Sequence, residues 1–352
     1  MAPLRSRPAA DMTNERTNRR RGGRRLFAAA AVLVLALALP LLIIQVDRMK
    51  HREEIEQYLA SSTAFCRIPE LDSGFIPQGL SYDPASDSVL LTGYYGRGGN
   101  SPIYVIDRQT GSAKKILMQT EDGGPFRGHA GGLSIYGGQV YIAGSTAGCM
   151  YVYPLEALLG AEDGGLQNAS AKIALKTADD FIRVSFTSEN GDLLYGGEFH
   201  KAPLFYTHAS HAVETKDGRQ SAYLFGFTVN GENTAVPQVV YAIPDKVQGA
   251  CFDGGYLYLS QTDGLLSARI LSYRLDELTP AGTKSVLGVE VPLYILSESG
   301  AVKSTRIPPM SEEIYVVDGK LLILYESASN RYRIGRKLGL DQVLATPVEF
   351  FR

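Results

Sequence analysis

The chain has 352 residues, enough for one large domain or two ordinary ones. Hydrophobic residues make up 45% and charged residues 20%, which is typical of a globular chain rather than a disordered one. Residues 1–46 hold eight arginines against Asp11 and Glu15, so the remaining residues carry a net charge of −8. An acidic body without a basic stripe argues against nucleic acid as a partner.

The N-terminal part predicts a membrane anchor. Residues 1–25 are expected to form a disordered cytoplasmic tail. Residues 26–46 contain no charge and would span roughly 30 Å as a helix, enough for one crossing of the lipid bilayer. Arginines before this run predict a single-pass protein of the cell membrane, with its N-terminus in the cytoplasm and its body outside. A cleaved signal peptide is the alternative, because Ala36-Leu37-Ala38 resembles a cleavage site, although the apolar run continues to Val46.

The chain changes character after the anchor. Residues 47–63 are polar with helical spacing and predict a short helical stalk. From residue 64 to residue 352, short strand-like runs are divided by turns rich in Gly, Asp and Asn. The three cysteines show no CxxC spacing, and we expect free or buried thiols.

The strand-like runs repeat. A strand, a turn and a second strand begin at Gln78 ("QGLSYDPASDSVLLTGYY"), at Gly131 ("GGLSIYGGQVYIAGS") and at Gln248 ("QGACFDGGYLYLSQT"). Looser copies begin at Arg183 and Glu312, and a third strand usually follows the second. The starts are 53, 52, 65 and 64 residues apart, and repeats of this size indicate the blades of an all-β propeller.

One blade carries a family resemblance. The segment "GLSYDPASDSVLLTGYYGRGGNSPIYVIDRQTGSAKKIL" resembles a blade of the bacterial membrane-anchored or secreted β-propellers with YVTN/NHL-type repeats. The resemblance extends over residues 64–352 and implies a propeller fold, but its motifs are structural and imply no activity. We count five blades, and six are the alternative because two intervals are long. Residues 64–71 are expected to supply the outer strand of the last blade and close the ring.

Blade geometry predicts a binding ring at one mouth of the central channel. In an antiparallel blade, the start of the first strand and the end of the second lie on the same face. Polar side chains that converge on rigid strands favour a binding site. The predicted ring consists of Gln78, Tyr94, Tyr95, His129, Arg183, Glu198, Gln248, Gln261, Glu312, Tyr325 and Glu326. The alternative is a mouth whose side chains bind only water and backbone groups.

The ring suggests particular chemistry. Paired carboxylates such as Glu312 and Glu326 can hold Ca²⁺ or divide acid and base roles, so Ca²⁺ is one cofactor to consider. Because alternate residues of a strand face opposite sides, we expect one of Glu312 and Glu313 to accept a backbone N–H and the other to be solvated. The three tyrosines of the ring are placed to stack on a sugar or another planar ligand.

The histidines give weaker signals. His129 has the chemistry of a general base or a metal ligand, but the sequence shows no partner for it. His208 and His211, in "HASH", have a loose metal-ligand spacing without a third ligand, so no metal site is assigned.

Two classes of function remain. The first is a non-catalytic propeller that binds a small molecule, a glycan or a protein at its mouth. The second is a propeller enzyme, such as a hydrolase, lyase or lactonase, that uses the acidic residues. The chain contains no P-loop, G-x-S-x-G or H-E-x-x-H motif, which favours binding.

Overall fold

The computed structural model describes residues 38–332 and 339–352. It divides into two compact units, Met1–Lys50 and His51–Arg352. In the first unit, residues 38–50 are helical, whereas the predicted tail and residues 26–37 of the predicted anchor lie outside the described residues. Across the described ranges, no helix is both long and apolar enough to cross a membrane.

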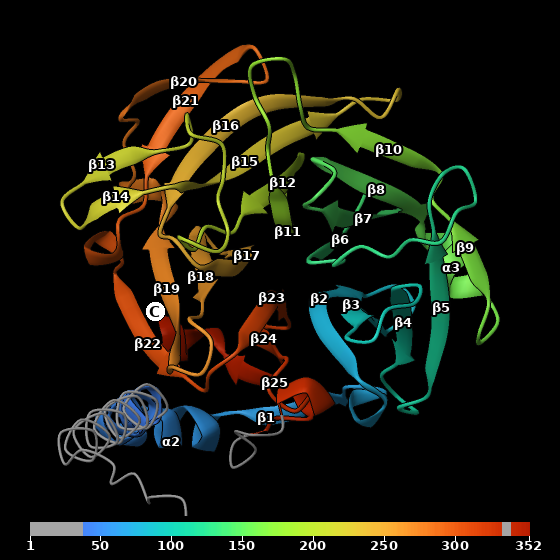
Figure 1. Cartoon of the computed structure of the whole chain (residues 1–352), viewed down its shortest axis with the longest axis horizontal. Helices are drawn as coiled ribbons and strands as arrows, with labels where there is room; N and C mark the ends of the chain where they lie inside the picture. The colour runs from blue at the N-terminus through green and yellow to red at the C-terminus, as the bar shows by residue number, and fades with distance from the viewer. Residues whose placement is uncertain (1–37, 333–338) are drawn as a thin grey trace, which may run out of the picture. The chain divides into compact units, whose positions relative to one another are not determined.

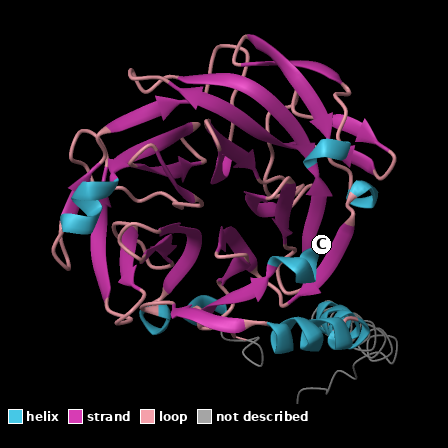
Figure 2. Cartoon of the chain, turned by 180° about the vertical axis from the view of Figure 1, so that it is seen from behind, coloured by secondary structure: helices cyan, strands magenta, loops and turns pink. Residues whose placement is uncertain are grey.

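The second unit is an all-β propeller with five blades. Strands dominate it, with a few short helices at its edges (Figure 2). Five sheets surround a central axis (Figure 1), and each innermost strand contacts the innermost strands of both neighbouring blades. These strands are β2 (Phe75–Asp83), β6 (Leu133–Tyr136), β11 (Val184–Asn190), β17 (Val247–Asp253) and β23 (Ser311–Val317).

Each blade continues outward from the axis by antiparallel pairing. Blade 1 adds β3 (Ser88–Tyr95), β4 (Pro102–Asp107) and β5 (Ala113–Gln119). Blade 2 adds β7 (Gln139–Gly144), β8 (Cys149–Pro154) and β10 (Ala171–Ala174). Blade 3 adds β12 (Leu193–Glu198), β15 (Ala222–Val229) and β16 (Ala235–Ile243). Blade 4 adds β18 (Tyr256–Gln261), β19 (Ala268–Arg274) and β22 (Lys303–Ile307), and blade 5 adds β24 (Lys320–Tyr325), β25 (Gln342–Pro347) and β1 (Thr63–Arg67).

The hairpin between β6 and β7 shows why glycine pairs mark the repeats. Gly137 and Gly138 have φ angles of 57° and 74°, and Gly254 and Gly255 in blade 4 have 53° and 82°. Positive φ at both central residues defines a type I′ turn, whose twist matches that of the paired strands. Glycine adopts this conformation without steric cost, so a glycine pair between two apolar runs predicts the inner hairpin of a blade.

Strand β1 closes the ring. It pairs antiparallel with β25, so that Thr63 lies opposite Ala345 and Arg67 lies opposite Gln342. The predicted closure by the segment that begins near residue 64 is therefore confirmed. The first and last strands of the propeller share blade 5, and β25 is paired on both of its edges.

The long intervals between repeats hold inserts rather than a sixth blade. A hairpin of β20 (Gly282–Val286) and β21 (Val289–Ile295) lies between β19 and β22 in sequence, but it extends blade 3 by parallel pairing with β16. Strand β9 (Leu166–Asn168) extends blade 1 in the same way through β5. The interval between the repeats that begin at Arg183 and Gln248 holds a separate hairpin of β13 (Val213–Thr215) and β14 (Gly218–Gln220). Five blades therefore account for every repeat.

Five hydrophobic clusters form the core, one in each interface between neighbouring blades. Cys149 and Cys251 are buried and Cys66 is half-buried, and all three are free thiols, as the sequence predicts. The remaining short helices are α3 (Leu155–Gly160), η1 (Leu71–Ser73), η2 (Leu275–Glu277), η3 (Glu298–Gly300) and η5 (Val348–Phe351).

The helix α2 (Arg52–Ser61) belongs to the propeller unit and contacts β22 and β25. Its Tyr58 is fully buried, and the Tyr325 hydroxyl donates to the Tyr58 hydroxyl at 2.9 Å. The ring of Tyr58 also packs on Phe351, with the ring centroids 6.2 Å apart. The predicted stalk, residues 47–63, therefore contains a helix that is packed against blades 4 and 5.

Candidate functional site

β-Bulges shape the mouth of the channel. In four blades, the register between the innermost strand and its neighbour shifts at the same place, namely between Pro77 and Gly79, Val184 and Phe186, Val247 and Gly249, and Ser311 and Ile314. A bulge re-aims side chains and leaves backbone groups out of the ladder. The bulged segments hold the predicted site residues Gln78, Gln248 and Glu312.

Glu312 and Glu326 form a buried carboxyl pair in blade 5, beside Gln78 of blade 1 and Gln248 of blade 4. Gln78 Nε2 donates to Glu326 Oε2 at 3.0 Å, and Gln248 Nε2 donates to Glu312 Oε1 at 3.5 Å. Burial raises the pKa of Glu326 to about 7, and burial together with the Glu326 and Glu313 carboxylates raises the pKa of Glu312 well above its ordinary value. Burial and the repulsion between two neighbouring carboxylates both favour the protonated form, so a proton shared between Glu312 and Glu326 stabilises the pair. It can therefore both donate and accept hydrogen bonds.

The Glu313 side chain extends from blade 5 toward the innermost strands of blades 2, 3 and 4. Its Oε2 accepts a hydrogen bond from the backbone N–H of Leu133, on blade 2, at 3.2 Å. Burial raises the pKa of Glu313 well above its ordinary value, while the N–H groups of Leu133, Thr187 and Ala250 act in the opposite direction. One carboxyl of blade 5 therefore interacts with backbone groups of three other blades.

The prediction for the neighbouring pair Glu312 and Glu313 is half right. Glu313 accepts a backbone N–H, as expected. Solvation of the other residue is wrong, because both side chains are 1% exposed. The bulge between Ser311 and Ile314 removes the strict alternation on which that prediction depends.

An aromatic rim lies beside the carboxyl pair. The rings of Tyr94 and His129 have centroids 4.4 Å apart, and Arg331 Nη1 donates to the Tyr94 hydroxyl at 3.3 Å. His129 is an exposed residue of the loop before β6. Partial loss of water and the Arg331 guanidinium nevertheless lower its pKa to about 4, so its imidazole is neutral at pH 7. Arg331 and Tyr332, which hydrogen-bonds with Glu326, follow β24 outside the repeat template, so nothing in the pattern predicts them.

Two predicted members of the ring lie elsewhere. The Tyr95 hydroxyl donates to Glu70 Oε2 at 2.5 Å and lies 2.7 Å from the Tyr104 hydroxyl. Tyr325 is buried against Tyr58. Each of these tyrosines is next in sequence to a mouth residue, so strand alternation directs its side chain to the opposite side. Of the three predicted stacking tyrosines, only Tyr94 reaches the mouth.

Three further members face other surroundings. Gln261 Nε2 donates to Glu298 Oε1 at 3.0 Å, and Gln261 lines a cleft of about 220 Å³ outside the channel. A separate cleft of about 560 Å³ borders η1. Arg183 Cζ lies 6.0 Å from the centre of the Phe181 ring, and its backbone N–H donates to Glu198. Glu198 itself points into blade 3. The mouth therefore brings together Gln78, Tyr94, His129, Gln248, Glu312 and Glu326.

Glu189, on β11, is a further carboxyl near Glu313 in the channel. Burial raises its pKa to about 7, and a hydrogen bond with Tyr315 acts in the opposite direction. Its Oε2 has no hydrogen-bond partner among the described residues. The repeat that begins at Arg183 is among the loosest copies of the template, so the pattern does not single this residue out.

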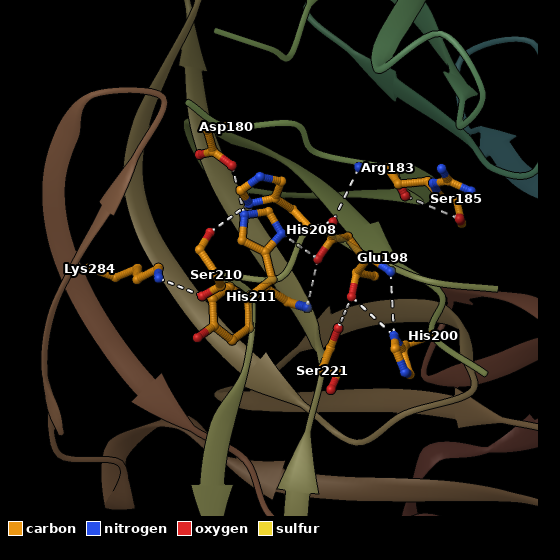
Figure 3. A network of polar contacts seen from close by, with 12 residues as sticks. Asp180, Arg183, Ser185, Glu198, His200, His208, Ser210, His211, Ser221 and Lys284 are labelled. Carbon is orange, nitrogen blue, oxygen red and sulfur yellow. Dashed lines mark hydrogen bonds and ion pairs between the residues drawn. The ribbon is translucent and has the colours of Figure 1, made fainter. Parts of the chain in front are cut away.

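A second polar cluster lies in blade 3 (Figure 3). His211 Nδ1 lies 3.0 Å from both carboxylate oxygens of Glu198, and His211 Nε2 lies 2.8 Å from Asp180 Oδ1. Burial alone would lower the pKa of His211, but these hydrogen bonds outweigh it and raise that pKa to about 9. His208 adjoins the same group, with its ring centroid 5.5 Å from that of His211. The "HASH" spacing points to the two histidines but not to Asp180, which approaches only in the fold.

The fold and the mouth define a class: a five-bladed β-propeller with a shared carboxyl pair and an aromatic rim at one end of its channel. No protein-family model matches the chain, and no curated protein matches it.

Among solved structures, three illustrate the similarity. The PQQ-bound aldose sugar dehydrogenase of Streptomyces coelicolor has 13% identity and a TM-score of 0.45, over 81% of this chain and 97% of that one. The glutaminyl cyclase of Myxococcus xanthus has 9% identity and a TM-score of 0.39, over 74% and 90%. The hydrazine synthase of Kuenenia stuttgartiensis has 11% identity and a TM-score of 0.35, over 70% of this chain and 55% of that one. The chain therefore spans little more than half of that protein.

Proposed function

We propose that this chain is a membrane-anchored propeller that binds a hydroxyl-rich ligand, of the glycan class, at the mouth of its channel without converting it. The observation that carries the proposal is the Glu312–Glu326 pair, which is flanked by two glutamine amides and an aromatic rim. Residues 26–46 anchor the chain, and the propeller lies outside the cytoplasm. The eight arginines that precede this uncharged run support the placement.

The chemistry of the mouth suits sugar hydroxyls. A hydroxyl both donates and accepts hydrogen bonds, and a carboxyl pair that shares a proton does the same. The amides of Gln78 and Gln248 add fixed donors and acceptors, and the Tyr94–His129 rings offer a face on which a sugar ring can stack. Because the His129 imidazole is neutral at pH 7, the rim carries one guanidinium, that of Arg331, beside uncharged groups.

Variants at the mouth are expected to lose the ligand and keep the fold. A screen of oligosaccharides by thermal shift, with the full chain in detergent, supplies the probe. His129→Ala, Gln248→Ala and Glu326→Gln should each weaken binding of that oligosaccharide about 10- to 100-fold, because a lost charge-assisted or buried contact costs roughly 1.5–3 kcal/mol. Gln261→Ala, a glutamine outside the mouth, is the matched control and should bind as the wild type does.

Two outcomes would contradict the proposal. If the three mouth variants lower the melting temperature but bind the oligosaccharide unchanged, the mouth is structural. If the chain hydrolyses or cleaves the oligosaccharide, and Glu326→Gln keeps binding but abolishes turnover, the protein is an enzyme that uses the carboxyl pair as acid and base. The shared proton of that pair is the observation that favours this second function.

The topology has its own test. Protease added to intact cells or spheroplasts is expected to degrade or release the propeller, because residues 26–46 hold it on the outer side of the membrane. An epitope placed before Arg5 should stay protected in the same samples. Protection of the propeller, together with cleavage only after the membrane is permeabilised, would overturn the extracytoplasmic placement.

A further inference from the structure

We infer that blade 3 holds a zinc site formed by Asp180, His208 and His211, with Glu198 as the residue that orients His211. Each of the three ligand residues offers one donor atom, and these atoms all lie within 4.8 Å of one another. This is the only such grouping of three or more His, Cys, Asp or Glu side chains within residues 38–332 and 339–352. It is separate from the channel mouth.

Two loops supply the ligands. Asp180 lies between β10 and β11, where the chain passes from blade 2 to blade 3. His208 and His211 lie in the insert between β12 and β13, and Figure 3 shows their rings beside the Asp180 carboxylate. A metal ion here would tie the insert to the loop that leads into the blade.

Glu198 is held rigidly. Its side chain is completely buried, and its two oxygens accept the backbone N–H groups of Arg183 at 3.2 Å and Tyr223 at 3.3 Å. The same carboxylate lies 3.0 Å from His211 Nδ1. A carboxylate that accepts the Nδ1–H of an imidazole directs Nε2 to the opposite side of the ring, here toward Asp180. Such a carboxylate is the usual outer partner of a histidine that binds a metal.

The ring of His211 is also fixed by packing. Its side chain is 1% exposed, and it stacks on Tyr223 with centroids 5.3 Å apart and planes 25° apart. Its Nε2 faces Asp180 Oδ1 at 2.8 Å, while Asp180 Oδ2 accepts the N–H of Leu287 at 2.9 Å. One oxygen of Asp180 is therefore occupied and the other is directed at His211. Both donor atoms are oriented before any metal arrives.

The donor set selects the class of metal. Two imidazole nitrogens and one carboxylate oxygen suit Zn²⁺ and related first-row divalent ions, whereas Ca²⁺ and Mg²⁺ prefer oxygen ligands alone. Three protein ligands leave a fourth position for water or a ligand group. His208 is half-buried rather than enclosed, so that position opens on the side of the insert. Binding would displace the hydrogen that His211 Nε2 shares with Asp180.

Metal binding by the full chain tests the inference. The chain is purified in detergent with a tag that contains no histidine, treated with a chelator, and titrated with Zn²⁺ alone by calorimetry and thermal shift. We expect one Zn²⁺ per chain and a higher melting temperature with the metal. His208→Ala and Asp180→Asn should weaken zinc binding at least a hundredfold, and Glu198→Gln should weaken it 10- to 100-fold.

The neighbouring acid provides a matched control. Asp179 is exposed, so Asp179→Asn should bind Zn²⁺ as the wild type does. His208→Ala changes a half-buried residue of an insert, and its melting temperature without metal should equal that of the metal-free wild type. If the wild type binds no Zn²⁺, or if Asp179→Asn and Asp180→Asn bind it equally, the cluster is an ion-pair network only and the inference fails.

Discussion

A chain that begins at Gln78 is expected to aggregate, whereas a chain that begins at Ser61 and keeps β1 stays soluble. The shortened chain lacks β1, so blade 5 ends at β25. The outer edge of β25 would then expose unpaired backbone groups, beside side chains that are buried in the closed ring, namely Val343, Leu344 and Ala345. An exposed apolar strand edge pairs readily with another chain. Size-exclusion chromatography of the two chains checks this.

A second truncation separates the strand from the helix. A chain that begins at Ser61 keeps β1 but loses Tyr58, which is buried among Tyr325, Phe350 and Phe351. Removal of a buried aromatic side chain from a core costs roughly 3–5 kcal/mol, so this chain should be soluble but melt at a lower temperature. Tyr58→Ala in the full chain should reproduce that loss. Equal solubility and equal melting temperatures for all of these chains would show that neither segment closes or stabilises the ring.

The sequence predicts the propeller well because its signals are local. Glycine pairs at the inner turns and the alternation of Val, Ile, Leu and Tyr define the hairpins without knowledge of their neighbours. Closure of the ring by β1 is also predictable from the sequence, because a last blade without a fourth strand requires an outer strand from another part of the chain. The parallel pairings of β9 with β5 and of β21 with β16 are not predictable in this way. Each of these inserted strands joins a blade other than the one to which its place in the sequence assigns it.

The candidate site was predictable only in part. Strand starts and ends place Gln78, His129, Gln248 and Glu326 on one face, and the mouth contains them. Alternation fails at Glu312 and Glu313 because a bulge has no clear signature in a single sequence. Asp180 meets His211 through folding of two loops, a proximity that spacing cannot reveal. The residues that were misplaced, such as Tyr95, differ from correctly placed ones by a single position.

The propeller is expected to lose stability as the pH rises from about 4.5 to about 7. Burial raises the pKa values of Glu189 and Glu326 from 4.5 to about 7, and it raises those of Glu312 and Glu313 well above their ordinary value. The folded state therefore binds these protons more tightly than the unfolded state does. The stability that these bound protons contribute is complete at a pH below the carboxyl pKa of the unfolded chain. It disappears as the pH rises through the carboxyl pKa values of the folded chain. The pKa of His129 is lowered to about 4, which makes the contribution of this residue to stability increase as the pH rises. This single exposed residue is outweighed by the four carboxyls.

Glu189→Gln tests this dependence at one position. A pKa raised from 4.5 to about 7 corresponds to about 3 kcal/mol between the two ends of the pH range. The variant should therefore show a flatter dependence of unfolding free energy on pH, measured by urea denaturation from pH 4.5 to 8. It should also be more stable than the wild type at pH 8, because the amide carries no charge to bury. Glu290→Gln, at an exposed position, is the matched control and should follow the wild type. If Glu189→Gln and the wild type lose stability in parallel across this range, Glu189 does not hold a proton in the folded state at neutral pH.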